Sequence, residues 1–544
     1  MKITKSTWAA VGTALLLAAC GGGGGGSAGT QSPNPNPGQL AQTPPPRITS
    51  LTAADYTAKL NGTTDGRGLL QLSSNGTGTL RCGVDVNYIN YGTVDGNGNN
   101  VVASAALMVP TGCAGPFPIV VHAHGVNIER RYNLADWPDS SNPAYKEAQT
   151  LGAIYAANGY IVVAPNYVGY DTSKASYHPF LVADQQSKDM YYALLAANSA
   201  LPTLISQPAT NGKVFVSGYS EGGHVALATQ KFLKTDATAV AKLASLSLVV
   251  KAAAPMSGPY ALQSFADQIV GGAVDAGSTR FMPMLVTAYQ KKYSSIYSSP
   301  SDVYTSTYAT GIESYFPGAL SYDDVAANNI VPNAALFNSA PSNATLLALS
   351  PPTTLPGGGT PTATQTALWT GGFGTPFLVN DSYRLGYLGD VLAYPASGST
   401  PPTNALRVAL RANDLTQTVP TPVGPTLLCG GGGDPVVYYS TNTTALKSTA
   451  GWTAGSAAVT EVNMDNNAGG TAGLFSTLQA GFTAKYSGTT STTFTDAYAA
   501  ALAANQTAPQ AQATAFKAVL AAYHTGLVPF CVKAAASYFA NPAF

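Results

Sequence analysis

The spacing of hydrophobic and polar residues changes along the chain. Residues 84–89 alternate between apolar and polar side chains, Asp-Gly-Asn-Gly follows at residues 95–98, and residues 101–108 are mostly apolar. This pattern predicts an antiparallel hairpin at the edge of a sheet. Beyond it, short apolar strands alternate with helical segments, which predicts a mostly parallel sheet with flanking helices. The predicted strands lie at residues 118–122, 160–165, 213–217 and from about 246 to 256, with a helix over residues 184–201.

A long insertion interrupts this alternation. Strand periodicity resumes only at residues 425–429, so residues 259–424 separate two strands and are far too many for an ordinary loop. We expect this insertion to form a cap over the carboxyl-terminal edge of the sheet, where open α/β folds bind ligands. A separate domain elsewhere on the molecule is the alternative.

A sharp turn is predicted where the strand at residues 213–217 meets the following helix. The sequence there is Gly-Tyr-Ser-Glu-Gly, at residues 218–222. Such a turn cramps the backbone of the central serine, and it is tolerated only when the residues two before and two after have almost no side chain. This is the pattern of a nucleophile elbow, which makes Ser220 the candidate nucleophile. A serine that only caps the helix is the alternative.

A serine nucleophile needs a histidine base and an acid that orients the base. In an elbow of this type the chain order is nucleophile, acid, histidine. Of the five histidines, three precede Ser220, and His224 lies too close to it in sequence to reach back over its hydroxyl. We therefore predict His524 as the base, in a loop after the last strand. A surface histidine on a C-terminal helix is the alternative.

Asp434 is the preferred acid because it follows a predicted strand and a run of glycines at residues 430–433. A strand end is where the sheet can present a carboxylate to the histidine. Asp465 is the second choice. The other carboxylates in the allowed interval fall within the insertion and are expected at the surface; they are Asp381, Asp390 and Asp414.

Two backbone N–H groups are the candidates for an oxyanion hole, those of Glu221 and Val126. The Glu221 side chain is expected to be exposed at the helix start, where a carboxylate is electrostatically favourable. His122 and His124 point to the same side of a strand, but no third ligand accompanies them, so no metal site is expected. The chemistry requires no cofactor.

The charge balance argues against a nucleic-acid partner, since 26 basic and 26 acidic residues cancel. At the N-terminus, Lys2 and Lys5 precede an apolar stretch at residues 8–17, and Leu-Ala-Ala-Cys ends at Cys20. This is typical of a bacterial lipoprotein signal peptide over residues 1–19, with lipid attached to Cys20. Soluble secretion is the alternative. A lipid there would anchor an exported protein to a cell-envelope membrane, with residues 20–47 as a disordered Gly- and Pro-rich tether. No protein partner is predicted.

Four further cysteines in an exported chain indicate two disulfides, for which three pairings are possible. We favour Cys82 with Cys113 and Cys429 with Cys531. The second bridge would connect the Asp434 loop to the region of His524 and so limit drift between them.

From about Gly83 to its end, the chain resembles the α/β-hydrolases, and among them the secretory-lipase type of bacterial and fungal esterases. The resemblance rests on His-Ala-His-Gly at residues 122–125, on residues 159–170, on the elbow and on residues 425–434. It implies an α/β-hydrolase fold whose core comprises residues 48–258 and 425–544. It also implies hydrolysis of a small-molecule or lipid ester through an acyl-enzyme. A serine peptidase and a non-catalytic surface-binding lipoprotein are the alternatives.

Overall fold

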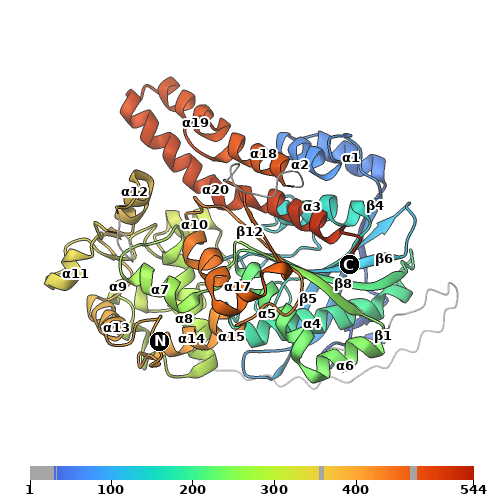
Figure 1. Ribbon diagram of the computed structural model, residues 1–544, viewed down its shortest axis with the longest axis horizontal. Helices are drawn as coiled ribbons and strands as arrows, with labels where there is room; N and C mark the ends of the chain where they lie inside the picture. The colour runs from blue at the N-terminus through green and yellow to red at the C-terminus, as the bar shows by residue number, and fades with distance from the viewer. Residues whose placement is uncertain (1–29, 32–33, 355–359, 466–474) are drawn as a thin grey trace, which may run out of the picture.

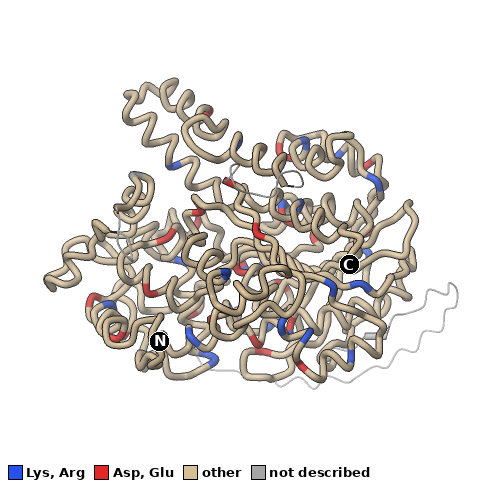
Figure 2. The backbone as a smooth tube through the Cα atoms, in the orientation of Figure 1, with Lys and Arg blue, Asp and Glu red and all other residues tan. Residues whose placement is uncertain are grey.

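The computed structural model describes residues 30–31, 34–354, 360–465 and 475–544. The predicted signal peptide and Cys20 lie outside the described residues. Lys, Arg, Asp and Glu are interspersed over the molecule (Figure 2).

A twisted sheet forms the centre of the molecule, with strand order β13-β12-β9-β8-β6-β7-β5-β4-β3 (Figure 1). The strands β13, β12, β9, β8, β6 and β7 pair in parallel, whereas β5, β4 and β3 form antiparallel pairs. The predicted fold class and the antiparallel hairpin of β4 and β5 are therefore confirmed. The predicted edge position of the hairpin is wrong, because β3 pairs with β4 and forms the edge. The strands are β3 (Arg47–Leu51), β4 (Gly83–Val94), β5 (Asn100–Thr111), β6 (Phe117–Ala123), β7 (Ile161–Pro165), β8 (Thr210–Tyr219), β9 (Val249–Met256), β12 (Thr426–Gly430) and β13 (Val459–Asn463).

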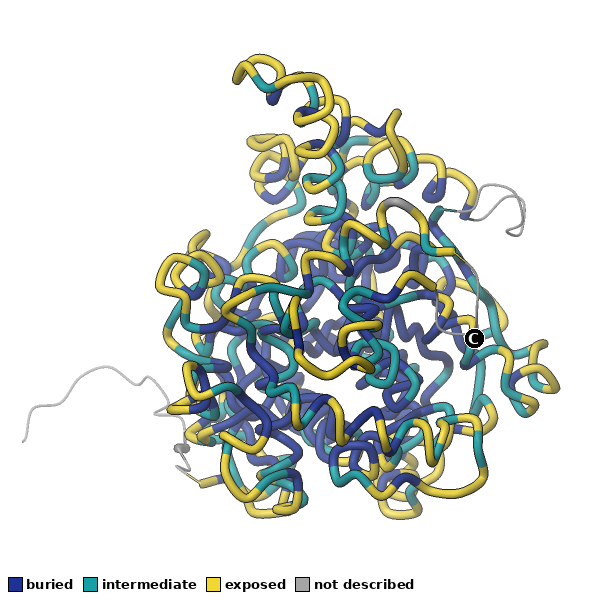
Figure 3. Tube along the Cα trace, turned by 90° about the vertical axis from the view of Figure 1, so that its left-hand side faces the viewer, coloured by how far each residue is buried: buried dark blue, intermediate teal, exposed yellow. Residues whose placement is uncertain are grey.

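The central strands are almost continuously apolar because helices cover both faces of the sheet. Every residue of β7 is buried, as is every residue of β12. Figure 3 shows this buried interior surrounded by exposed loops and helix faces. The flanking helices are α1 (Ala53–Asn61), α2 (Thr64–Ser73), α3 (Tyr145–Ile154), α4 (Ala183–Ala200), α5 (Glu221–Thr235) and α6 (Ala237–Ser245).

The insertion between β9 and β12 forms a cap with a hydrophobic core of its own. That core also takes in residues 177–182 of the body, so the cap packs on the segment that leads into α4. In Figure 1 the cap gathers on one side of the sheet. Its elements are α7 (Leu262–Val270), α8 (Ser278–Tyr293), α9 (Ser306–Ala309), α10 (Tyr322–Ala327), β10 (Phe337–Asn338), α11 (Ala344–Ala348), α12 (Ala363–Gly371), β11 (Phe373–Gly374), α13 (Asp381–Ala393), α14 (Ala405–Asn413) and α15 (Leu415–Thr418).

The C-terminal region ends in one long helix, α20 (Ala508–Phe539). The prediction that His524 lies in a loop is therefore wrong, because it stands inside this helix. The segment is rich in alanine, the strongest helix former, and its apolar residues let it pack on the body. By length and composition α20 would suffice to cross a membrane, but it is partly buried against the protein. The other helices here are α16 (Ala445–Ser448), α17 (Ala450–Ala454), α18 (Ser476–Tyr486) and α19 (Thr492–Ala503), and α19 projects with the start of α20 from the body (Figure 1).

The predicted tether is wrong at its C-terminal end. Residues 34–46 lie along β4, with bridges from Pro37 to Gly92 and from Leu40 to Tyr91. The close approach depends on the absent side chain of Gly92, where a Cβ atom would lie 2.2 Å from the carbonyl oxygen of Pro35. Two short strands, β1 (Thr30–Gln31) and β2 (Gln42–Thr43), also pair in this region.

Candidate active site

Ser220 stands at a strained corner between β8 and α5. Its backbone has φ 60° and ψ −122°, a conformation that side-chain-bearing residues rarely adopt. The two glycines are required by contact: a Cβ atom on Gly218 would lie 2.0 Å from the carbonyl oxygen of Gly222. A Cβ atom on Gly222 would lie 1.9 Å from the carbonyl oxygen of Ala123. The local geometry is that of the predicted elbow.

The structure brings Ser220, His524 and Asp434 together from three distant parts of the sequence. His524 Nε2 lies 2.9 Å from Ser220 Oγ, and His524 Nδ1 lies 2.7 Å from Asp434 Oδ2. The Asp434 side chain is almost fully buried, whereas that of His524 is 12% exposed. The candidate base is thus within hydrogen-bond reach of both the candidate nucleophile and the candidate acid.

The acid is held by its own loop. Asp434 Oδ1 accepts hydrogen bonds from the N–H groups of Val436 (2.9 Å) and Val437 (3.1 Å). Asp465, the second-choice acid, contacts this loop instead of His524. It accepts a hydrogen bond from the Gly433 N–H at 2.8 Å and another from the Tyr523 hydroxyl.

Two further connections fix the base. The Tyr219 hydroxyl, next to the nucleophile, donates to the backbone carbonyl of His524 at 2.5 Å. Both favoured disulfides are present, and the bridge between Cys429 and Cys531 joins β12 to α20. The other joins Cys82 to Cys113. The strand before the acid and the helix that carries the base are therefore covalently linked.

The Glu221 side chain is buried, contrary to the expectation that it is exposed. Its Oε1 lies 2.6 Å from His178 Nε2 and 2.6 Å from Gln186 Nε2. His178 Nδ1 in turn lies 2.9 Å from the carbonyl oxygen of Val168. Sequence reasoning missed His178 and Gln186 because they precede the elbow and only the fold brings them to it.

The cap carboxylates expected at the surface are instead largely buried. Asp390 pairs with Arg407 at 2.5 Å. Asp414 accepts a hydrogen bond from the Gln263 N–H at 3.0 Å. Asp381 is half-buried and accepts one from Asn338. These carboxylates hold the cap together and do not contact His524, so the expectation of solvated groups is wrong.

Comparisons with known proteins agree with this architecture. The model of the X-Pro dipeptidyl-peptidase (S15 family) matches residues 95–270, which include the elbow. The rice cell wall degrading esterase LipA from Xanthomonas oryzae is 22% identical, with a TM-score of 0.59, over 90% of this chain and 98% of that chain. A Legionella pneumophila protein is 19% identical, with a TM-score of 0.56, over 77% of this chain and 90% of that chain. The chain has the α/β-hydrolase fold. A comparison with curated proteins finds no match.

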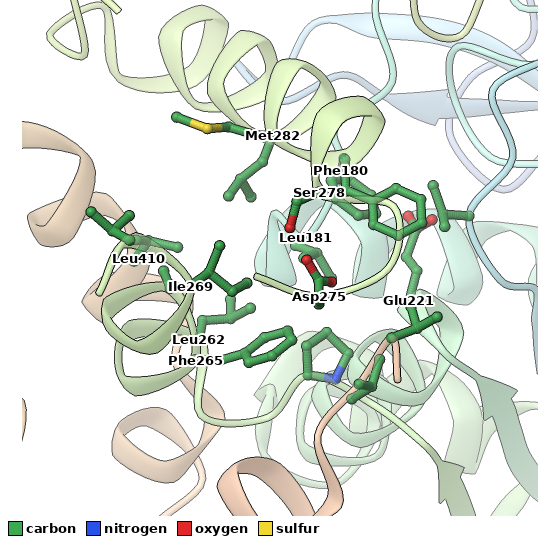
Figure 4. Close-up of a pocket in the computed structure, with 18 of the residues that line it drawn as sticks. Phe180, Leu181, Glu221, Leu262, Phe265, Ile269, Asp275, Ser278, Met282 and Leu410 are labelled. Atoms are coloured by element: carbon green, nitrogen blue, oxygen red, sulfur yellow. The ribbon is translucent and has the colours of Figure 1, made fainter. Parts of the chain in front are cut away.

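In this α/β-hydrolase fold a pocket of about 120 Å³ opens beside Ser220, between the elbow and the cap. Figure 4 shows its apolar walls, contributed by side chains such as Phe180, Leu262, Phe265 and Ile269. Val436 and Val437 of the acid loop complete one side. The cap therefore covers the elbow, and the lining of the pocket between them is mostly apolar.

The predicted oxyanion donors border the same pocket. Val126 and Glu221 both line it together with Ser220. The chain before Val126 passes close to the nucleophile, since a Cβ atom on Gly125 would lie 3.4 Å from Ser220 Cβ. Their role as donors stays a prediction.

The remaining histidines have structural contacts. His122 Nδ1 lies 3.1 Å from Ser217 Oγ, and the His124 ring stacks on Tyr132 and Tyr167. His224 Nε2 donates to the Asn413 carbonyl at 2.9 Å and so ties α5 to the cap, and its burial lowers its pKa to about 4. Among the residues that the structure describes, no group of three or more His, Cys, Asp or Glu is placed to hold a metal ion.

Proposed function

We propose that the protein is a serine hydrolase that cleaves carboxylic esters. The observation that carries the proposal is the pair of hydrogen-bond distances from His524, 2.9 Å to Ser220 Oγ and 2.7 Å to Asp434 Oδ2, beneath an apolar pocket. That arrangement serves acyl transfer, because it delivers an activated hydroxyl to a carbonyl carbon beside an apolar pocket.

In the proposed reaction His524 Nε2 takes the Ser220 proton as Oγ attacks the ester carbonyl. Asp434 holds the imidazole orientation through Nδ1 and stabilises its cationic form. The Glu221 and Val126 N–H groups bind the oxyanion, each contributing about 3 kcal/mol to transition-state stabilisation. His524 then protonates the leaving alcohol, and water releases the acid by the same route. None of these steps uses a cofactor.

A serine peptidase is the second candidate, favoured by the family model that matches residues 95–270. Recognition of a peptide N-terminus would require a free anionic group near Ser220. Glu221 is already engaged by His178 and Gln186, and burial raises the pKa of Asp275, the other pocket carboxyl, to about 8. The apolar lining, together with the engaged Glu221 and the raised pKa of Asp275 among the described pocket residues, therefore supports an ester.

The test is hydrolysis of p-nitrophenyl esters from acetate to palmitate, with an X-Pro p-nitroanilide beside them, by a chain that lacks residues 1–29. We expect ester turnover that falls by a factor on the order of 10⁴ or more in Ser220→Ala. The acyl-length profile would distinguish a lipase from a short-chain esterase. Cleavage of the anilide alone would favour the peptidase. If the folded protein hydrolyses none of these compounds and does not react with a fluorophosphonate, the non-catalytic binding protein would be favoured.

We also propose that the protein is exported and anchored through lipid on Cys20. The two disulfides support this, because such bonds persist in oxidising compartments. Growth of the expressing bacterium with radiolabelled palmitate should label the wild-type protein and leave Cys20→Ser unlabelled. Equal labelling of both would contradict the anchor.

A further inference from the structure

Two polar side chains in the apolar pocket beside Ser220 combine no part in the proposed reaction with no hydrogen bond to another described side chain. They are Asp275 and Ser278, which are 7% and 5% exposed. In Figure 4 their oxygen atoms point into the centre of the pocket, between Leu181 and Ile269. Within the part of the chain that the structure describes, neither Asp275 Oδ1 nor Ser278 Oγ has a hydrogen-bond partner.

Unpartnered groups of this kind are unfavourable in the folded protein. A buried hydroxyl or carboxyl without a hydrogen bond costs about 1–3 kcal/mol, and most buried polar groups are paired for that reason. Glu221 Oε2 is unpartnered as well, but Glu221 is fixed through Oε1 by His178 and Gln186. No other side chain fixes Asp275 Oδ1 or Ser278 Oγ in this way within the described structure, so a ligand in the pocket can pair with both.

The position of the pair relative to the reacting groups is fixed. Asp275 belongs to the short loop before α8, and Ser278 is the first residue of that helix. Between them, the Ala276 N–H donates to the carbonyl oxygen of Pro435 at 2.9 Å. Since Pro435 follows Asp434 directly, the polar pair moves together with the acid loop.

Burial favours the neutral form of the Asp275 carboxyl and raises its pKa to about 8. A hydrogen bond with the backbone of Asp275 itself lowers the pKa, and the charge of Asp434 raises it. No Lys, Arg or His is among the described residues that line the pocket. A protonated carboxyl donates one hydrogen bond and accepts another, as does the serine hydroxyl. The matching ligand group is a hydroxyl, which also donates and accepts.

We propose that Asp275 and Ser278 recognise a hydroxyl group on the apolar part of the ester that occupies this pocket. The preferred substrates are then hydroxylated esters, in which an otherwise apolar acyl or alcohol group carries one hydroxyl. This specificity rests on the proposed ester hydrolysis. The plain analogue leaves both side chains unpaired, and a site built for a hydroxyl rejects a substrate that lacks one.

The experiment compares matched esters by pH-stat at pH 7. Methyl esters of 2-, 3- and 6-hydroxyhexanoic acid are measured against methyl hexanoate, and 3-hydroxybutyl butyrate against butyl butyrate. We expect kcat/KM to be at least tenfold higher for one hydroxylated ester than for its plain analogue. A preference in the first series would place the recognised hydroxyl on the acyl group, and a preference in the second would place it on the alcohol group. Asp275→Leu and Ser278→Ala should each reduce that ratio toward one. Asp275→Asn, which still donates and accepts, should preserve it.

Met282→Leu is the matched control, because Met282 lines the same pocket without a polar group. It should preserve the ratio. Circular dichroism shows whether Asp275→Leu is folded, and Ser278→Ala tests the same idea with a smaller change. Hydrolysis of all esters at equal rates would overturn the proposal while leaving the ester hydrolase intact, whereas no ester turnover at all removes the proposed function itself. If methyl 6-aminohexanoate were preferred and Asp275→Asn abolished that preference, the recognised group would be an ammonium and not a hydroxyl, which would overturn the proposal.

Discussion

The two sides of the pocket treat their polar groups in opposite ways. On the sheet side, Ser220 is hydrogen-bonded to His524, and Glu221 is hydrogen-bonded to His178 and Gln186. On the cap side, Asp275 Oδ1 and Ser278 Oγ point into the pocket without partners in the described structure. The sheet side thus already hydrogen-bonds Ser220 Oγ and Glu221 Oε1 without a ligand, whereas the cap side leaves one oxygen each of Asp275 and Ser278 for a molecule that enters the pocket. Under the two proposals, this difference separates residues that position the chemistry from residues that select the substrate.

The largest effect should come from the acid on the sheet side. Asp434→Asn keeps the shape of the side chain but loses the charge that stabilises the His524 cation and fixes its tautomer. We expect kcat to fall by about 10⁴, or roughly 5 kcal/mol of transition-state stabilisation. Steady-state kinetics with the best p-nitrophenyl ester would measure this.

Asp465→Asn is the matched control, because Asp465 contacts Gly433 and Tyr523, the neighbours of the acid and the base. We expect only about a tenfold loss of kcat from it, since it positions the loop and does not bind His524. If Asp465→Asn were the more damaging of the two, the acid would be misassigned.

The order of elements, the nucleophile Ser220 and the base His524 could be predicted from the sequence, with Asp434 as the preferred acid and Asp465 as the second choice. Strand and helix periods are local patterns. The order nucleophile, acid, histidine requires a histidine well beyond Ser220, and His524 is the only one in the sequence that meets this condition. The strain at Ser220 follows from its glycine neighbours. The structure also corrects the surroundings of His524, since an alanine-rich helix presents it to the serine.

The side chains that depend on the cap could not be predicted. His178 reaches Glu221 only after the elbow and the segment before α4 are packed together. Asp275 lies among small and apolar residues, Gly-Gly-Ala-Val-Asp-Ala-Gly at residues 271–277, and nothing in that sequence distinguishes a pocket carboxyl from a loop carboxyl. Contacts between distant segments depend on packing that no local pattern contains.

The disulfide between Cys429 and Cys531 should have the next largest effect. It closes 102 residues of chain, so its loss in a Cys429→Ala/Cys531→Ala variant should lower the free energy of unfolding by about 4 kcal/mol. Because it joins the strand before Asp434 to the helix of His524, kcat should fall as well. Urea unfolding and ester kinetics measure the two effects. As the control, Cys82→Ala/Cys113→Ala should lower the free energy of unfolding and leave kcat unchanged. If the two double variants lost the same amount of kcat, the Cys429–Cys531 disulfide would have no specific role in positioning His524.

Removing the Glu221 side chain should destabilise the fold by a smaller amount. Glu221→Ala leaves His178 Nε2 and Gln186 Nε2 buried without an acceptor, which costs about 3 kcal/mol. Urea unfolding would measure it. Lys231→Ala, on an outer turn of the same helix, should change stability by less than about 0.5 kcal/mol. A Glu221→Ala variant as stable as the wild type would show that the paired groups of the sheet side are not needed for its organisation.

Asp275 should respond in the opposite direction, with an effect that depends on pH. Its carboxyl stays protonated in the folded protein up to about pH 8, whereas in the unfolded chain it ionises near pH 4. Between these values the folded state binds the extra proton, so Asp275 lowers stability as the pH rises, by at most about 1.4 kcal/mol per pH unit. Asp275→Asn removes this penalty and should gain stability over the wild type from pH 5 to pH 7, by roughly 1 kcal/mol per unit because water enters the pocket. Urea unfolding of both proteins at pH 5, 6 and 7 tests it. A constant difference across that range would mean that Asp275 is ionised and already paired, and the contrast between the two sides of the pocket would not hold.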